Sequence, residues 1–410
     1  MPRQMKDSGI EWIGVMPEIW DCLELKYFVH VNNGKEIGNE VSKDDVVAYP
    51  VYGSGGIFKY TDQYMYDGTC VMFGRKGTLG KPIFVTDKFW TVDTMYYLTH
   101  TDELDAKFNY YQLVAFDWES HITQTALPSV VASEIVSCKF PMPPKDEQIA
   151  IAAFLDMQCT QIDSVLGQTR ASIEEYKKLK QAMITQAVTK GVSGERAMKD
   201  SEVEWLGIIP ADWNVYRIAN LYDERSESGL EELPILTVSI NTGVSDHEIA
   251  DEDKDRVFVR REDRTKYKRV YPGDLAYNMM RAWQGAFGAV RVDGMVSPAY
   301  VVAKPKKNVE LDSRYMEALL RTSEATEEMH RYSRGIVDFR LRLYWPEFKN
   351  IRICLPPIAE QIEIADYIDE KSAAIDALIA KKEAFAAELE NYKKSMIYEY
   401  VTGKKEVPQS

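Results

Sequence analysis

The amino-acid sequence predicts an α+β protein in which two mixed, strand-rich domains are separated by two long antiparallel coiled-coil helices, as a pseudo-two-fold internal repeat. Three observations lead to this fold class. Blocks of sequence occur twice, two long proline-free stretches carry a helical pattern of apolar residues, and the regions between them alternate β-rich runs with glycine-rich turns. The chain has 410 residues, enough for two or three domains, and its 45% hydrophobic content can fill their cores.

The internal repeat is visible near the start of the chain. Met5–Trp20 and Met198–Trp213 are identical at nine of sixteen positions, including both tryptophans, the glycine and the proline. A second repeated block, Pro-Pro-x-x-Glu-Gln-Ile, begins at Pro143 and again at Pro356. Two similar halves in one chain predict a pseudo-two-fold assembly that resembles a homodimer fused end to end.

Each Pro-Pro block opens a predicted long helix, Pro144–Val188 in the first half and Pro357–Thr402 in the second. Apolar residues recur at steps of three and four, as they do along one face of an α-helix. A helix of roughly 45 residues is about 65 Å long. We expect the two apolar faces to pack as an antiparallel coiled coil that forms a spacer, with an ordinary helical-bundle core as the alternative. The predicted packing residues are Leu155, Ile162, Leu166, Ile173, Tyr176, Ile368, Ile375, Ile379, Leu389 and Tyr392.

The first strand-rich region places basic and hydroxyl side chains in glycine-rich turns between the predicted strands Cys70–Phe73, Pro82–Val85 and Met95–Leu98. Glycine allows a backbone to approach a ligand closely, and these side chains can reach phosphates or base edges. Gly74–Lys81 also fits the G-x-x-x-x-G-K pattern, but Pro82 and a strand follow it, so no ATP site is predicted. The candidate contacts are Tyr52, Ser54, Arg75, Lys76, Thr78 and Lys81.

The second strand-rich region interleaves arginines with aromatic residues, in Lys254–Arg269, Tyr271–Val290 and Arg331–Arg342. Arginine can bind guanine or phosphate with two hydrogen bonds, and aromatic rings can stack on bases. Carboxylates are interspersed with the basic residues, so a solvated charged face is the alternative. The candidate contacts are Arg260, Arg261, Arg264, Lys266, Lys268, Arg269, Asn278, Arg281, Trp283, Gln284, Arg334 and Arg340.

Composition limits the classes of function. The net charge of −14 argues against nonspecific nucleic-acid binding by bulk charge, so DNA contact would need local basic surfaces or partner subunits. Five scattered cysteines without a C-x-x-C pair indicate reduced thiols and a cytoplasmic protein, and no metal site is expected. No apolar run is long enough to predict a membrane span. The sequence also lacks a methyltransferase tetrad, a SAM-binding glycine motif and a nuclease-like cluster, so it predicts a binding protein rather than an enzyme.

These motifs resemble the family of specificity (S) subunits of type I restriction-modification systems. The repeated W-[IL]-G-x-x-P-x-x-W at Trp12–Trp20 and Trp205–Trp213, together with the repeated Pro-Pro block, carries the resemblance over nearly the full length. The stretches YGSGG, GRKGTLGKP and YPGDLAYNMMRAWQGAFG look like target-recognition-domain sequences. The resemblance implies target recognition domains at 1–142 and 198–355, a first long helix at 143–197, and a second long helix with the C-terminal tail at 356–410.

The resemblance further implies that each recognition domain reads one half of an asymmetric bipartite site in double-stranded DNA. The helices would act as spacer and docking surface for two methyltransferase (M) subunits, and two restriction/translocase (R) subunits would join for restriction in host defence. SAM, ATP and magnesium would belong to the partners, with no cofactor in this chain. Two alternatives remain: a stand-alone bipartite DNA-binding or architectural protein, and a coiled-coil interaction scaffold without a DNA role.

Overall fold

A computed structural model describes residues 3–123, 127–248, 266–335 and 341–408. By its internal contacts the chain divides into two compact units. Unit 1 comprises Met1–Ala171 and Lys382–Ser410, and unit 2 comprises Ser172–Lys381. Both boundaries fall within long helices, α3 (Lys145–Lys190) and α8 (Ile358–Val401), so each unit holds one strand-rich domain and part of each helix. The sequence-based division at residues 142, 197 and 355 stays a prediction.

The two long helices begin and end in the same way, and they confirm the predicted helical stretches to within about two residues. In the first turn of α3, Glu147 N and Gln148 N donate to the carbonyl of Pro144 at 2.9 and 3.0 Å. The equivalent amides of α8 bind the carbonyl of Pro357 at the same distances. Each proline directly precedes the first helical residue, where the lack of an N–H costs the helix no hydrogen bond. After each helix a glycine, Gly191 or Gly403, has a positive φ of 79° or 72° and ends it in the left-handed conformation.

Helix α3 is also the one helix in the described part of the chain that is long and apolar enough to cross a membrane by length and composition alone. That is weak evidence for a membrane span, because the core helix of a soluble protein passes the same test. Here one stripe of α3 is buried against protein, including Leu155 and Ile162 in unit 1.

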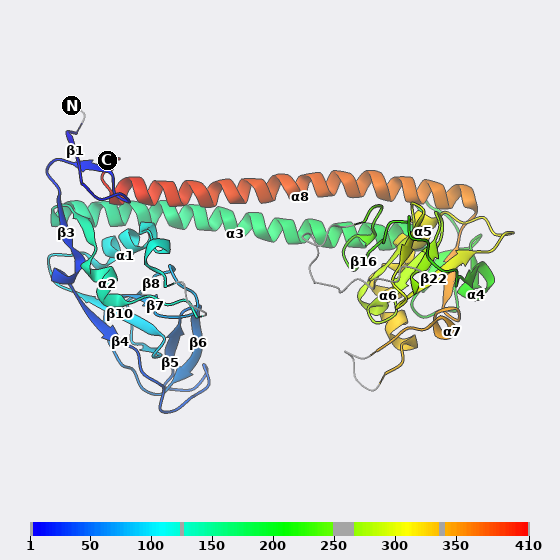
Figure 1. Cartoon of the computed structure of the whole chain (residues 1–410), viewed down its shortest axis with the longest axis horizontal. Helices are drawn as coiled ribbons and strands as arrows, with labels where there is room; N and C mark the ends of the chain where they lie inside the picture. The colour runs from blue at the N-terminus through cyan, green and yellow to red at the C-terminus, as the bar shows by residue number, and fades with distance from the viewer. Residues whose placement is uncertain (1–2, 124–126, 249–265, 336–340, 409–410) are drawn as a thin grey trace. The chain divides into compact units, whose positions relative to one another are not determined.

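Unit 1 is built around an antiparallel four-stranded sheet with the strand order β4-β10-β7-β8 (Figure 1). A three-stranded sheet, β6-β5-β9, and the pairs β1-β2 and β3-β11 complete its strands. The elements are β1 (Met5–Asp7), β2 (Val15–Pro17), β3 (Asp21–Glu24), η1 (Leu25–Tyr27), β4 (Val29–Asn33), β5 (Tyr49–Gly53), β6 (Gly56–Thr61), β7 (Cys70–Gly74), β8 (Ile83–Val85), β9 (Trp90–Thr91), β10 (Met95–His100), α1 (Ala106–Ala115), η2 (Glu119–His121), α2 (Ala132–Ser137) and β11 (Lys139–Met142).

The main core of unit 1 joins this sheet to the paired helices. Trp20, Phe73, Phe108 and Phe140 are fully buried in it, and they pack in the same cluster as Leu155 of α3. A smaller cluster of buried residues includes Cys70, Met72, Phe89 and Met95, with Tyr52 of β5 packed against it. Since successive strand residues face opposite sides of a sheet, β7 contributes Val71 and Phe73 to one cluster and Cys70 and Met72 to the other.

Unit 2 has the same central sheet, with the strand order β15-β22-β19-β20. The pairs β12-β13 and β14-β23 match β1-β2 and β3-β11, whereas β16-β17 and β18-β21 are different additions. The repeat therefore extends into regions where the two sequences differ. The elements are β12 (Met198–Asp200), β13 (Ile208–Pro210), β14 (Asn214–Arg217), α4 (Ile218–Leu221), β15 (Tyr222–Glu224), β16 (Val238–Ser239), β17 (Gly243–Val244), β18 (Lys268–Val270), β19 (Leu275–Asn278), η5 (Ala282–Gln284), β20 (Phe287–Ala289), β21 (Gly294–Val296), β22 (Tyr300–Pro305), α5 (Ser313–Leu320), α6 (Ser323–Tyr332), α7 (Trp345–Phe348) and β23 (Arg352–Leu355).

The two helices pack against each other within each unit, and ion pairs flank the apolar seam. In unit 1, Lys393 Nζ contacts Asp163 at 2.7 Å, and in unit 2, Lys180 Nζ contacts Asp376 at 2.6 Å. Of the predicted packing residues, Leu155, Ile162, Leu166, Ile173, Ile368 and Ile379 are buried, and Tyr176, Ile375 and Leu389 are half-buried.

Tyr392 differs from these residues, because its side chain is 56% exposed. The neighbouring Lys393 turns toward α3 instead and pairs with Asp163. One residue is 100° of rotation on an α-helix, which is enough to move Tyr392 out of the seam. A contact between Tyr392 and a partner subunit stays a prediction.

Candidate nucleic-acid interface

The basic turn of unit 1, defined as Gly74–Lys81, joins the antiparallel strands β7 and β8. Its backbone is held in place, because Arg75 N donates to Thr94 O at 2.8 Å and Val130 N donates to Arg75 O at 3.0 Å. The side chains of Arg75 and Lys81 are exposed, and that of Lys76 is half-buried. None of the three has an acidic side chain within 4 Å among the residues that the structure describes. The turn thus presents three unneutralised positive charges on a fixed backbone, which suits phosphate or base contact.

Ser54 and Thr78, two of the predicted contacts, are hydrogen-bonded to each other and fix the shape of this turn. Ser54 Oγ accepts a hydrogen bond from Thr78 N at 3.1 Å. Gly77 lies against the same hydroxyl: its φ is +85°, and a Cβ there would be 2.6 Å from Ser54 Oγ. The bond attaches the basic turn to the tip of the β5–β6 hairpin.

Tyr52 is half-buried and packs within unit 1, and its contact with DNA stays a prediction. Its ring lies edge-to-face on Phe89, with centroids 6.2 Å apart, and its carbonyl accepts the hydroxyl of Thr91 at 2.9 Å. Burial raises the pKa of the Tyr52 hydroxyl. The sequence offered only an aromatic beside a glycine turn, and tertiary packing turned that ring toward the core.

In unit 2, three predicted residues come together around Tyr300. Lys268 Nζ donates to the carbonyl of Tyr300 at 2.8 Å, and Asn278 is paired with Tyr300 in the register of β19 and β22. Burial raises the pKa of the Tyr300 hydroxyl, and the nearby positive charge of Arg281 opposes that shift. We call Lys268, Asn278, Arg281 and Tyr300 the β19 cluster. It places two cations and an amide at the end of one central strand.

The turn after β19 has a defined shape. Asn278 Oδ1 accepts the amide of Met280 at 3.0 Å, and the carbonyl of Asn278 accepts the amide of Arg281 at 2.9 Å. Gly285, with a φ of +91°, closes the short helix η5. Gln284 on this helix is exposed. The Asn278 amide oxygen is therefore used inside the protein, and its NH₂ group is the part available to a ligand.

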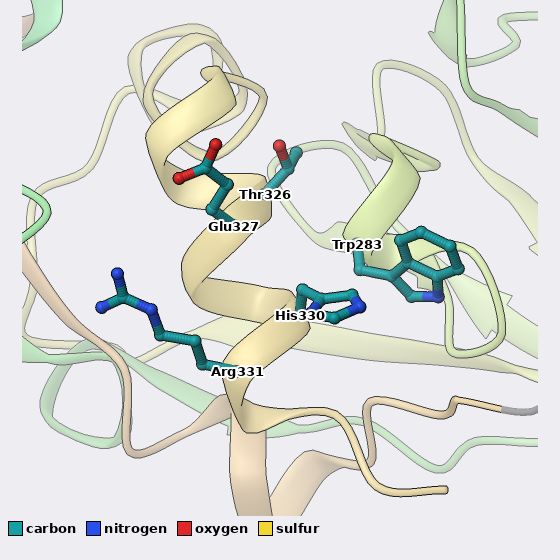
Figure 2. A pocket seen from close by; sticks show the side chains of 5 residues that line it. All are labelled: Trp283, Thr326, Glu327, His330 and Arg331. Atoms are coloured by element: carbon teal, nitrogen blue, oxygen red, sulfur yellow. The ribbon is translucent and has the colours of Figure 1, made fainter. Parts of the chain in front are cut away.

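Trp283 lies on the same turn and is half-buried against α6. Figure 2 shows its indole beside His330, and the two rings meet edge-to-face with centroids 5.2 Å apart. Together with Thr326, Glu327 and Arg331 they line a pocket of about 340 Å³. The indole Nε1 is buried and has no hydrogen-bond partner in the described part of the chain. Stacking of Trp283 on a base stays a prediction.

Two other predicted cations have partners within the protein. Arg269 follows Lys268 and therefore lies on the opposite face of β18, where its guanidinium sits 4.6 Å from the ring centre of Tyr271. Arg334 is 74% exposed and pairs with Glu347 at 2.7 Å. The Arg269 guanidinium thus packs on Tyr271, and its contact with DNA stays a prediction. Lys266 is exposed, and Arg260, Arg261, Arg264 and Arg340 lie outside the described residues.

A repeated polar contact at the start of each long helix was not assigned from the sequence. Trp20 Nε1 donates to Glu147 Oε2 at 2.9 Å, and Trp213 Nε1 donates to Glu360 Oε2 at the same distance. Arg3 pairs with Glu147, and Arg196 pairs with Glu360. We call these two groups the helix-start locks.

The glutamine of each Pro-Pro block has a matching role. Gln148 Oε1 accepts the amide of Asp105 at 2.8 Å, and Gln361 Oε1 accepts the amide of Asp312 at 2.9 Å. The sequence signal was present, because Arg3 and Arg196 stand at the same distance before the repeated Met-Lys-Asp-Ser. Without coordinates, nothing connected these arginines to glutamates far along the chain.

Comparisons with known proteins agree with this architecture. A family model described as the type I restriction modification DNA specificity domain matches residues 17–175. The type I restriction enzyme MjaVIII specificity subunit of Methanocaldococcus jannaschii is 24% identical, over 95% of this chain and 93% of its own. The EcoprrI specificity subunit of Escherichia coli is also 24% identical, over 31% of this chain and 32% of its own.

One solved structure shares the fold over almost the whole chain. It is described as the structural basis underlying complex assembly and conformational transition of the type I R-M system, and it has a TM-score of 0.65 at 14% identity. The match covers 95% of this chain and 99% of that one. By these comparisons the chain resembles the specificity subunits of type I restriction-modification systems.

Proposed function

We propose that this chain reads an asymmetric bipartite site in double-stranded DNA, with unit 1 and unit 2 each recognising one half-site. The observation that carries the proposal is the pair of matched sheets, β4-β10-β7-β8 and β15-β22-β19-β20, which hold different surface turns. The basic turn stands on the first sheet and the β19 cluster on the second. Two scaffolds of one topology with unlike contact residues are suited to two unlike half-sites.

The long helices act as the spacer between the recognition domains and as the docking surface for two M subunits. Support comes from apolar side chains left open on the helices, such as Met157 at 51% and Phe385 at 46% exposure. Exposed apolar side chains of this size favour contact with a protein partner. Two R subunits would join this assembly for restriction.

No reaction is assigned to this chain itself. Methylation and cleavage belong to the partner subunits, which would bring SAM, ATP and magnesium, and the specificity subunit directs them to the target. The five free cysteines fit a cytoplasmic location, because reduced thiols persist there.

The test is to co-express this chain with its M subunit and to sequence the methylated positions of the host genome. A motif of two unlike halves separated by a spacer is the expected result. A continuous palindrome would contradict the proposal, because two unlike readers cannot produce one.

Gel shifts separate the alternatives. The S subunit should bind cognate DNA well only after M joins, because the acidic chain relies on its partners for part of the phosphate contact. Equal binding without M would favour a stand-alone DNA-binding protein. Absence of DNA binding in both states would favour an interaction scaffold.

A further inference from the structure

The tip of the β5–β6 hairpin leaves two adjacent apolar side chains open to solvent. Ile57 is 49% exposed and Phe58 is 54% exposed. The rest of unit 1 therefore covers neither of these two apolar side chains. The base of the hairpin is anchored, since Val51 is fully buried and β5 pairs in parallel with β9. The base of the hairpin is therefore fixed to the rest of unit 1, and its tip is apolar and exposed.

A β-bulge sets the position of Phe58. Tyr52 is paired with Ile57 and Val51 with Lys59, so Phe58 has no residue opposite it. Bulges redirect a side chain relative to a regular strand. The Phe58 ring lies against Gly53, where a Cβ would be only 3.2 Å from two ring carbons. Glycine at position 53 is thus what allows the ring to occupy this place.

The apolar tip is attached to the basic turn. The bond from Thr78 N to Ser54 Oγ, at 3.1 Å, joins the two segments directly, and Gly77 allows their close approach. The unneutralised cations Arg75, Lys76 and Lys81 belong to that turn. An apolar end flanked by cations is complementary to a duplex, which presents phosphates outside and stacked base faces inside.

We propose that the hairpin tip acts as a wedge, in which Ile57 and Phe58 enter a base step of the first half-site while the basic turn holds the flanking phosphates. This deepens the proposed function and rests on it. Pyrimidine–purine steps unstack most easily, so the wedge selects a flexible step without hydrogen-bonding its bases. Ile57 and Phe58 are then specificity-determining residues that read deformability.

The experiment uses the assembled complex of this chain with its M subunit and the duplex identified by methylome sequencing. 2-Aminopurine is placed in turn at each step of the first half-site, where its fluorescence rises on unstacking. We expect a rise at one step with the wild type and loss of that rise in the Ile57→Ser, Phe58→Ser double variant. Affinity for the cognate duplex should fall at least tenfold, with little change in salt dependence because the phosphate contacts remain.

Val46→Ser is the matched control, since Val46 is a fully exposed apolar residue of the same unit beside Asp44 and Asp45. It should change neither signal. The single Phe58→Ser variant, with its circular dichroism and its M-subunit binding checked, guards against loss of fold.

The outcomes are distinct. If the wild-type complex binds its target with no rise at any step, and the double variant binds equally well, the wedge is wrong and the proposed function stands. If the double variant instead fails to assemble with M, the tip is a protein-docking surface and the wedge is also wrong. If the wild-type complex does not prefer its target over scrambled DNA, the proposed function fails first.

Discussion

Single residues of the candidate interface divide into exposed cations and residues that hold the turns in shape. Arg75 and Lys81 are exposed, whereas Ser54 is used in a hydrogen bond and Arg269 stacks on Tyr271. All four carry side chains that suit DNA contact, and the sequence identified them by residue type alone. The direction of each side chain depends on neighbours that are distant in the chain, such as Thr78 for Ser54.

Replacing Arg75 and Lys76 together by alanine should weaken recognition of the first half-site only. Each lost base contact costs about 1–3 kcal/mol, and each lost phosphate contact lowers the salt dependence of binding. Binding of the S–M complex to cognate and scrambled duplexes at several salt concentrations measures both effects. Lys88→Ala is the control, because Lys88 already pairs with Asp67 at 3.7 Å. Unchanged discrimination in the double variant would remove Arg75 and Lys76 from the interface.

We expect the stability of the protein to depend on pH through His100. His100 is half-buried in unit 1, where its Nε2 lies 3.0 Å from Asn109 Oδ1, and partial burial lowers its pKa from the ordinary value. The unfolded chain takes up a proton near pH 6.5, and the folded state resists protonation until lower pH. The contribution of His100 is therefore present above about pH 6.5 and is lost as the pH falls through its folded pKa.

Urea unfolding at pH 7.5 and pH 5.5 measures this contribution. The free energy of unfolding should fall less between these pH values in His100→Gln than in the wild type, whereas His30→Gln, at an exposed site, should behave like the wild type. An equal fall in the free energy of unfolding in all three proteins would contradict the assignment to His100.

At the scale of elements, the two halves share more than their sequences show. The long helices, the Trp-containing segments and the Pro-Pro blocks were readable because they repeat residue by residue. The matching of β4-β10-β7-β8 with β15-β22-β19-β20 was not readable. Many different sequences satisfy one strand order, since a sheet requires only alternating burial and suitable turns.

The helix-start lock of unit 2 is predicted to stabilise the start of α8. Glu360→Ala would leave the N–H of the fully buried Trp213 without an acceptor and Arg196 without this partner. An unsatisfied buried donor costs about 1–3 kcal/mol, so the free energy of unfolding should fall by that amount. Glu370→Ala removes only an exposed ion pair with Lys371 and should change the free energy of unfolding by less than about 0.5 kcal/mol. Urea unfolding followed by tryptophan fluorescence compares the two variants, and equal losses would argue against the lock.

At the scale of the whole molecule, the boundaries of the two compact units fall inside α3 and α8. Both helices continue without interruption through those boundaries, at Ala171–Ser172 and Lys381–Lys382. This continuity is what a spacer requires, because a helix lengthens by a constant rise for each residue.

Inserting four helix-forming residues at both boundaries should lengthen the DNA spacer and leave both half-sites unchanged. Four residues add about 6 Å, on the order of one to two base-pair steps. Matched insertions in α3 and α8 keep the seam in register, whereas an insertion in α3 alone should lower stability. Methylome sequencing reads the spacer directly. A changed half-site with an unchanged spacer would contradict the spacer role of the helices.

The sequence by itself determined the repeat, the two long helices and the family resemblance, because each depends on local patterns: period, helix start and end residues, and repeated motifs. Only the tertiary structure decided which side chains are available to DNA. It packed Tyr52 on Phe89 and Arg269 on Tyr271, paired Glu147 and Glu360 with distant tryptophans, and brought the apolar tip at Phe58 next to the basic turn. The physical reason is that side-chain direction is set by contacts between segments far apart in sequence, and local propensity carries no information about those contacts.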